Sequence, residues 1–314
     1  MFRKHTRRAA KAAFAISFGV ALLIGVITAG TAGAAKATKK PTIVLGTKNF
    51  PEEYILGQLY GQALQAKGFK VVYKGNFGNS EEADTAIRSG KMNFYPEYTG
   101  IIALDLAQTP SSHETFPKTA AATYAYAQKY EQKHHLMLLA RTPFVDADTV
   151  TMLRATAQAD GVKTISDLSK LSSFNYAGYP ECQLRITCFA GLQQIYHLSK
   201  ATFTSLGSIS VYTLLDQKQI DGGDGFTTDP QQKSKKYTTL VDNKHIFGYE
   251  NVAPVLSQKL LKGSNGMLLE ATCNNVSKLL TVGAMRAMDA AAYAQKGTPK
   301  QIAHAFLKAN HLVK

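Results

Sequence analysis

The sequence predicts an α/β protein built from two lobes. Short β-branched and aromatic segments alternate with longer amphipathic segments between residues 42 and 95, and this βαβαβ order favours a mostly parallel sheet with helices on its faces. A second alternation follows between residues 149 and 241, and two helical segments close the chain. The 279 residues that follow position 35 in this 314-residue chain are enough for two lobes of about 100–150 residues each.

The elements of the first alternation follow from local signals. The expected strands are residues 42–45, 70–73 and 93–95. Pro51, followed by two glutamates, is a typical start for the first helix, and Gly68 ends it. The second helix begins at Ser80, which is also followed by two glutamates.

The rest of the chain continues the pattern. Further strands are expected at residues 136–139, 149–153, 174–177, 209–212, 219–221 and 239–241. Helices are expected at residues 119–133, 164–170, 189–197, 276–294 and 302–308, with a short helix that runs through Leu215.

The connections predict that the chain passes between the lobes twice, near residues 141–148 and near residues 243–251. Lobe 1 then begins with residues 36–147, and residues 148–245 form lobe 2. Residues 246–314 return to lobe 1 and supply the C-terminal helices. Two crossings make a hinge beside a cleft.

Residues 1–35 predict a signal peptide. Five basic residues precede an uncharged apolar stretch from Ala12 to Ala35, and the small residues from Ala32 onward suit cleavage after Ala34 or Ala35. An uncleaved anchor is the alternative, because about 20 apolar residues can span a bilayer. No cysteine follows the stretch, so a lipid anchor at that place is not expected. We expect an exported protein that lies outside the cytoplasm or is associated with the cell envelope.

The chain is basic, with a formal net charge of +14. It has no cluster of Lys and Arg with interleaved aromatic residues, so nucleic-acid binding is not expected. A diffuse positive surface facing an anionic envelope accounts for the charge. We expect a monomer.

Cysteine usage supports an oxidising compartment. Cys182 and Cys188 are close enough in sequence to close a small loop as a disulfide in an exported protein. A metal site is the alternative, but no histidine lies near them at a zinc-type spacing. Cys273 is then expected to be buried and inert.

No motif typical of a nucleophilic hydrolase, a zinc protease or a nucleotide-hydrolysing P-loop occurs in the chain. An enzyme with a closing cleft stays open as an alternative class. The aspartates at positions 221, 224 and 229 could hold Ca²⁺, but they lack the EF-hand spacing and its terminal glutamate. We therefore expect no catalytic residue, no metal and no cofactor.

The segment Tyr95-Pro-Glu-Tyr-Thr-Gly100 carries the strongest indication of a binding site. It follows a predicted strand, and ligands of α/β sheets bind at such strand ends. The faces of tyrosine rings attract soft cations such as a quaternary ammonium group.

Five ordered motifs resemble one family. They are Gly46-Thr-Lys-Asn-Phe-x-Glu-x-Tyr-Ile-Leu-Gly57, Ser89-Gly-Lys-Met-Asn-Phe-Tyr-Pro-Glu-Tyr-Thr-Gly100, Arg185-x-x-Cys-x-x-Gly-Leu-x-x-x-Tyr196, Asp224-x-Phe-x-Thr-Asp229 and Tyr249-x-Asn-x-Ala-Pro-Val255. Together they resemble the substrate-binding proteins of glycine betaine/choline-type ABC importers. The resemblance spans nearly all of the chain beyond the signal peptide. It implies a type II periplasmic-binding-protein fold with two crossover hinges, which closes on a small-molecule ligand and delivers it to ABC permease subunits in the membrane.

The resemblance also implies roles for individual residues. Lys48 and Arg185 match basic residues that hold a ligand carboxylate, although each could instead be an ordinary surface residue. Tyr98 matches a wall of an aromatic cage, with Tyr95 packed beneath the site. Phe226 and Tyr249 match aromatic positions, although each could instead pack in a core.

Two positions depart from the family pattern. Ile101 stands where members often have a threonine or an acid, and Thr149 stands where another cage tyrosine is usual. Asp148, beside Thr149, could instead meet a cation or an amine. We expect a binding protein for glycine betaine, choline, carnitine or a related solute; the alternatives are another small polar ligand, such as an amino acid, or an envelope sensor.

Overall fold

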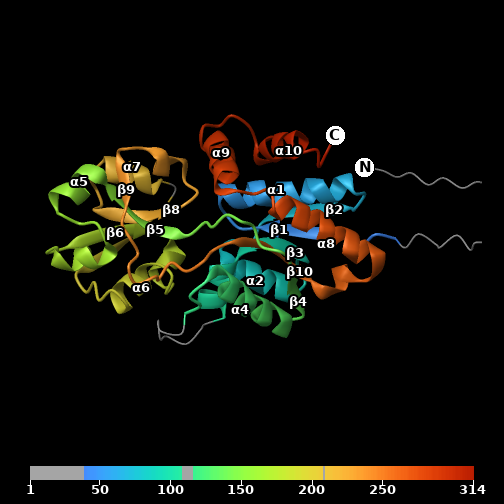
Figure 1. Ribbon diagram of the computed structural model, residues 1–314, viewed down its shortest axis with the longest axis horizontal. Coiled ribbons are helices and arrows are strands. Elements are labelled where there is room, and N and C mark those ends of the chain that lie inside the picture. The colour runs from blue at the N-terminus through green and yellow to red at the C-terminus, as the bar shows by residue number, and fades with distance from the viewer. Residues whose placement is uncertain (1–38, 108–115, 208) are drawn as a thin grey trace, which may run out of the picture. The chain divides into compact units, whose positions relative to one another are not determined.

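The computed structural model describes residues 39–107, 116–207 and 209–314 (Figure 1). The predicted signal peptide at residues 1–35 lies outside these described residues. Within the described part of the chain, none of the helices has both the length and the apolar character needed to cross a bilayer.

The first of two sheets has the strand order β2-β1-β3-β10-β4. Its strands are β1 (Ile43–Thr47), β2 (Val71–Asn76), β3 (Phe94–Tyr98), β4 (Leu136–Leu138) and β10 (Val252–Ser257). The strands predicted in this region run parallel, β1 pairing with both β2 and β3. β10 runs antiparallel between β3 and β4, so a late segment of the chain completes the sheet.

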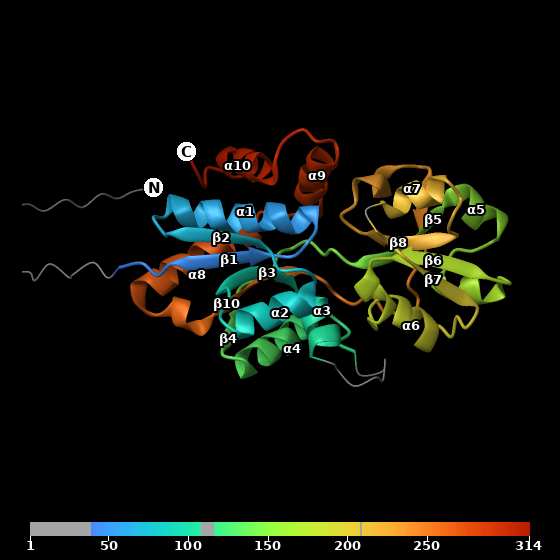
Figure 2. The ribbon, with the colours of Figure 1, turned by 180° about the vertical axis from the view of Figure 1, so that it is seen from behind.

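Helices cover both faces of the first sheet (Figures 1 and 2). One face packs against α1 (Pro51–Ala66) and α8 (Gly263–Ser277), and the buried core there includes Leu45, Leu59 and Leu269. α9 (Val282–Tyr293) and α10 (Pro299–Ala309) pack against α1, beyond the sheet. The other face packs against α2 (Ser80–Arg88) and α4 (Ala120–Lys133). A short turn of helix, α3 (Thr99–Ile101), and a π-helical turn, η1 (Ile102–Leu106), follow β3.

The second sheet has the order β7-β6-β8-β5-β9. Its strands are β5 (Asp148–Leu153), β6 (Phe174–Gly178), β7 (Ala201–Ser205), β8 (Gly222–Phe226) and β9 (Tyr237–Thr239). The helical elements of this lobe are α5 (Arg154–Ala159), η3 (Ile165–Lys170), η4 (Pro180–Gln183), α6 (Phe189–Gln194), α7 (Val211–Asp216) and η5 (Pro230–Lys233). α6 packs on one face of the sheet and α7 on the other, each with its own apolar core. The predicted two-lobed α/β fold is confirmed.

The two segments that link the sheets lie side by side. Val145 and Asn251 form an antiparallel bridge, and the Asp146 amide donates to the Glu250 carbonyl at 2.9 Å. The Asn251 side chain donates to the carbonyls of Thr142 and Phe144 at 3.0 and 2.8 Å. The chain therefore passes between the lobes twice through one hydrogen-bonded pair of segments.

Three predicted elements are wrong in detail. The strand expected at residues 209–212 is instead the start of α7, because the Ser210 hydroxyl accepts the Thr213 amide at 3.3 Å and caps a helix. The strand expected at residues 219–221 is displaced, since β8 begins at Gly222. The single helix expected at residues 276–294 is two helices, because the Thr281 hydroxyl caps the start of α9.

The predicted disulfide between Cys182 and Cys188 is confirmed, with a sulfur–sulfur distance of 2.06 Å. It closes a loop at the carboxyl end of β6. Cys273 is a buried thiol on α8, and burial raises its pKa, as is usual for an inert core cysteine.

Candidate ligand-binding site

A cavity lies between the two sheets, at the carboxyl ends of β1, β3, β6 and β8. The cavity has a volume of about 60 Å³, which is room for several waters or a small ligand. This is the position at which ligands bind to open α/β sheets. Its walls come from both lobes, so relative movement of the lobes would open or close it.

Each lobe contributes one pair of aromatic rings to the wall. Phe50 and Tyr98, from the ends of β1 and β3, have ring centroids 6.1 Å apart. Tyr179 and Phe226, from the ends of β6 and β8, have centroids 6.2 Å apart. Tyr179 is the most open of the four, with 36% of its surface exposed.

Tyr98 is fixed on two sides. Its hydroxyl donates to a Glu52 carboxylate oxygen at 2.7 Å. The Lys48 ammonium lies 4.1 Å from the centre of its ring, so an internal cation already contacts the π system. The same ammonium lies 5.5 Å from the centre of the Phe50 ring, so the rings of Tyr179 and Phe226 are better placed than those of Tyr98 and Phe50 to receive a ligand cation.

Lys48 is not a solvated loop residue. It is 2% exposed, its ammonium contacts the Glu97 carboxylate directly, and it donates to the Ser80 hydroxyl at 3.3 Å. A second carboxylate oxygen, from Glu53, lies 3.8 Å away. Burial raises the pKa of Glu53 to about 8, although the Lys48 charge acts to lower it. Glu97 is therefore the main partner of the Lys48 charge.

Arg185 joins the lobes. Its guanidinium donates from two nitrogens to the two carboxylate oxygens of Glu81 on α2, at 3.1 and 2.8 Å. Partial burial acts to raise the pKa of Glu81, but the hydrogen bonds and charge of Arg185 outweigh it and lower the pKa. This bidentate geometry is the strong form of an arginine–carboxylate pair.

Buried carboxyl groups dominate the remaining wall. Burial, aided by like charges nearby, raises the pKa of Asp146, Asp148, Asp224 and Glu250. Asp148 and Asp224 also share a hydrogen bond. One Glu250 carboxylate oxygen has no hydrogen-bond partner among the described residues. These groups favour a ligand that brings positive charge or hydrogen-bond donors.

Gly100 allows Glu250 to reach this wall. A Cβ atom at position 100 would lie 2.5 Å from the Glu250 Cγ atom, so a side chain there would push the glutamate away. The glycine of the Tyr-Thr-Gly motif therefore has a packing role beside the cavity.

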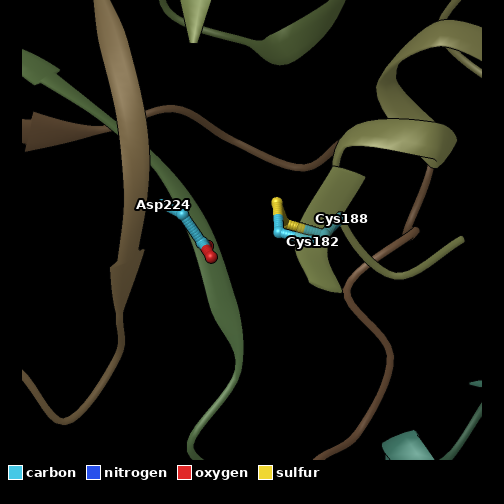
Figure 3. A group of neighbouring side chains, drawn as sticks. All are labelled: Cys182, Cys188 and Asp224. Atoms are coloured by element: carbon cyan, nitrogen blue, oxygen red, sulfur yellow. A yellow bond between two sulfur atoms is a disulfide. The ribbon is translucent and has the colours of Figure 1, made fainter. Parts of the chain in front are cut away.

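Among the residues that the structure describes, the geometry at the candidate metal ligands does not favour a metal ion. The sulfurs of Cys182 and Cys188 and a carboxylate oxygen of Asp224 lie within 4.8 Å of one another. The sulfurs are bonded to each other in the disulfide (Figure 3), so they are not thiolates. The calcium alternative requires Asp221, Asp224 and Asp229 to converge. Asp221 precedes β8 and accepts the Asn175 amide, whereas Asp229 follows the strand and accepts the Tyr212 hydroxyl.

Residues 41–309 match the family described as the substrate-binding domain of ABC-type glycine betaine transport systems. The chain belongs to this family. The match covers both lobes and both crossing segments, so the resemblance read from the sequence motifs is confirmed.

Individual relatives agree with the family. The chain is 26% identical to a glycine-betaine-binding protein of Pseudomonas aeruginosa over 292 residues, covering 89% of this chain and 91% of the relative. It is 21% identical to the carnitine transport binding protein OpuCC of Listeria monocytogenes, covering 87% and 88% of the two chains.

Solved structures confirm the type II periplasmic-binding-protein fold. A glycine betaine/carnitine/choline ABC transporter protein aligns with a TM-score of 0.68 and 18% identity, covering 86% of this chain and 99% of that one. Lactococcal OpuAC, closed on glycine betaine, aligns with a TM-score of 0.61 and 16% identity, covering 87% of this chain and 97% of that one. Members of this family are transport binding proteins that take up small ligands and work with permease components.

Five of the seven candidate ligand-binding residues line the cavity. They are Lys48, Tyr98, Asp148, Arg185 and Phe226. Tyr249 does not reach it, because its hydroxyl donates to the Lys118 carbonyl at 3.0 Å and its ring lines a separate hollow. Thr149 is buried behind the wall, where its hydroxyl donates to the Gly225 carbonyl at 2.8 Å. Ile101, which departs from the family pattern, also lines the cavity.

Sequence reasoning missed several members of the wall. Phe50 stands inside the first family motif and Asp224 opens the fourth, so motif position alone could have indicated both. Tyr179 follows β6 as Tyr98 ends β3, and the same strand-end argument applies to it. No sequence pattern indicates Glu250, because it reaches the cavity wall only through the path of the second crossing segment.

Proposed function

We propose that this protein is the extracytoplasmic binding component of an ABC importer and that its cavity captures a small quaternary ammonium compound. The observation that carries the proposal is the pairing of aromatic rings from both lobes around one cavity with a carboxyl-rich wall. The relatives whose names include glycine betaine and carnitine support the same ligand class.

The chemistry of the cavity wall is complementary to such a ligand. A quaternary ammonium ion has no N–H to donate and is recognised by the faces of aromatic rings. Tyr179 with Phe226 on one lobe and Phe50 on the other supply such faces, and the nearby Asp148 carries a negative charge when it is ionised. Closing the lobes would bring the rings onto the cation and exclude water, which strengthens both interactions.

The family role implies two further steps. We propose that residues 1–35 direct export and that the closed, loaded protein docks on permease subunits in the membrane. The disulfide supports an oxidising compartment outside the cytoplasm.

Isothermal titration calorimetry of the mature protein tests the ligand class. The panel is choline, glycine betaine, carnitine and the primary amine ethanolamine. We expect at least one quaternary compound to bind, and Phe226→Ala to weaken it about tenfold, because a cation–π contact is worth about 0.5–2 kcal/mol. Tyr126→Ala is the matched control, since this tyrosine is on α4, is 36% exposed and lies outside the cavity wall. If no quaternary compound binds, the ligand assignment fails.

A further inference from the structure

We propose that Glu81 is a specificity-determining residue that directs the site toward cations without a carboxylate and against zwitterions. It does so by occupying Arg185, the residue that would otherwise hold a ligand carboxylate. This inference rests on the proposed function, because it presumes that the cavity binds a quaternary ammonium group.

The first step is the geometry of Arg185. Both of its contacts to Glu81 are within hydrogen-bond range, at 3.1 and 2.8 Å, and they fill one edge of the guanidinium with two carboxylate oxygens. The Arg185 side chain is only 15% exposed, so little of it stays open to a second partner. A ligand carboxylate would have to displace Glu81 before it could form the same pair.

The second step is the other cation. Lys48 and Arg185 are the basic side chains among the described residues that line the cavity. Lys48 is committed to Glu97, which is itself fully buried and also accepts the Tyr98 amide at 2.7 Å. Neither cation is therefore available to a ligand carboxylate without breaking an internal ion pair.

The third step is the charge of the remaining wall. Asp146, Asp148, Asp224 and Glu250 are all buried there, so a ligand carboxylate would meet carboxyl groups. A ligand hydroxyl would instead find acceptors, including the Glu250 oxygen that has no partner among the described residues. The wall therefore favours a cation with a neutral polar end.

Glu81 can be changed without loss of the helix that carries it. Its side chain is 44% exposed, and the N-terminus of α2 is capped by Asn79 and Glu82, which bond each other's backbone amides. Glu81→Gln keeps the shape and removes the charge, whereas Glu81→Ala removes the contact altogether.

The experiment compares choline and glycine betaine as probes in calorimetric titrations of the wild type, Glu81→Gln and Glu81→Ala. We expect the wild type to prefer choline. In both variants the ratio of glycine betaine affinity to choline affinity should rise about tenfold or more, because a charge-assisted bidentate pair becomes available. Adding Arg185→Met to Glu81→Gln should abolish this rise. Glu270→Gln, on the exposed face of α8, is the matched charge control and should leave the ratio unchanged.

The outcomes separate the two proposals. If the wild type binds choline but the ratio stays the same in both Glu81 variants, the inference fails while the proposed function stands. Equal or tighter binding of glycine betaine by the wild type likewise overturns the inference alone. If neither the wild type nor the variants bind either probe, the inference fails, and the proposed function fails with it unless the wild type binds carnitine. Glycine betaine binding that appears only in the Glu81 variants supports the inference.

Discussion

Asp148 lies at the start of β5, where it shares a hydrogen bond with Asp224 and faces the charge of Arg185. Burial raises the pKa of Asp148 to about 7, against the lowering effects of Arg185 and of the hydrogen bond. A carboxyl group with this pKa changes charge near neutral pH. Whether it helps to hold a ligand cation therefore depends on pH.

We expect choline, or whichever quaternary cation binds, to bind about tenfold more tightly at about pH 8 than at about pH 6, because the cation favours the ionised Asp148. Calorimetry across this range measures the effect, and Asp148→Asn should flatten the profile. A wild-type profile that is flat would exclude Asp148 from the site.

The effect of Asp148 on folding stability has the opposite pH dependence. Because burial raises its pKa in the folded protein, the contribution of Asp148 to the free energy of unfolding is fully present below the unfolded pKa of about 3.9 and is lost as pH rises through about 7.

The limits of sequence reasoning are clearest at Lys48 and Arg185. Motif position placed both in the cavity wall, but it did not show that carboxylates of the same chain hold them. Glu81 precedes Arg185 by 104 positions and Glu97 follows Lys48 by 49, so the tertiary fold brings these pairs together. Tyr249 and Thr149 show the complementary difficulty: a residue type at a family position does not fix which way its side chain points.

At the scale of elements, the loop from η4 to α6 combines the disulfide with two residues of the wall, Glu181 and Arg185. Arg185 lies between the bonded cysteines, so the covalent link restricts the segment that carries the guanidinium. The loop is short and contains only one turn of 3₁₀ helix. Its order should therefore depend strongly on the disulfide.

Replacing both Cys182 and Cys188 with serine should lower the free energy of unfolding by about 2 kcal/mol, the amount that closing so small a loop removes from unfolded-chain entropy. Differential scanning calorimetry measures this change, and titration should show weaker ligand binding. Reductant should affect the wild type in the same way and leave the double variant unaltered. An unchanged unfolding temperature would show that the loop is held by its other contacts.

Elements with clear local patterns were predictable, and those defined by tertiary packing were not. The β1–α1–β2–α2–β3 run has β-branched strands and capped helices, and the structure contains all five elements. β8 has the sequence Gly-Gly-Asp-Gly-Phe, which has low intrinsic strand preference. Packing accounts for the glycines: a Cβ at Gly223 would lie 2.0 Å from Val211 on α7. β10 contains Pro254 yet forms the antiparallel link between β3 and β4, which no local signal indicates.

At the scale of the whole molecule, the proposed export depends on the predicted signal peptide at residues 1–35. We expect the mature protein to begin at Ala35 or Lys36, because the small residues from Ala32 onward suit a signal peptidase. N-terminal sequencing and intact mass of the protein recovered outside the cytoplasm would check this. Replacing Ala32 and Ala34 with bulky residues should leave the precursor uncut. Recovery of wild-type protein with its first 35 residues intact would instead support an anchor.

The antiparallel pair of crossing segments has a consequence for how the chain matures. The second sheet uses only residues from 148 to 239, whereas the first must wait for β10, which ends at Ser257. The polypeptide is synthesised from its N-terminus, so the second sheet can form completely while the first sheet still lacks β10, one of its interior strands. Until β10 arrives, β3 keeps an unpaired edge that invites association with other chains. The period between the synthesis of β3 and that of β10 is therefore when this protein most needs protection from aggregation.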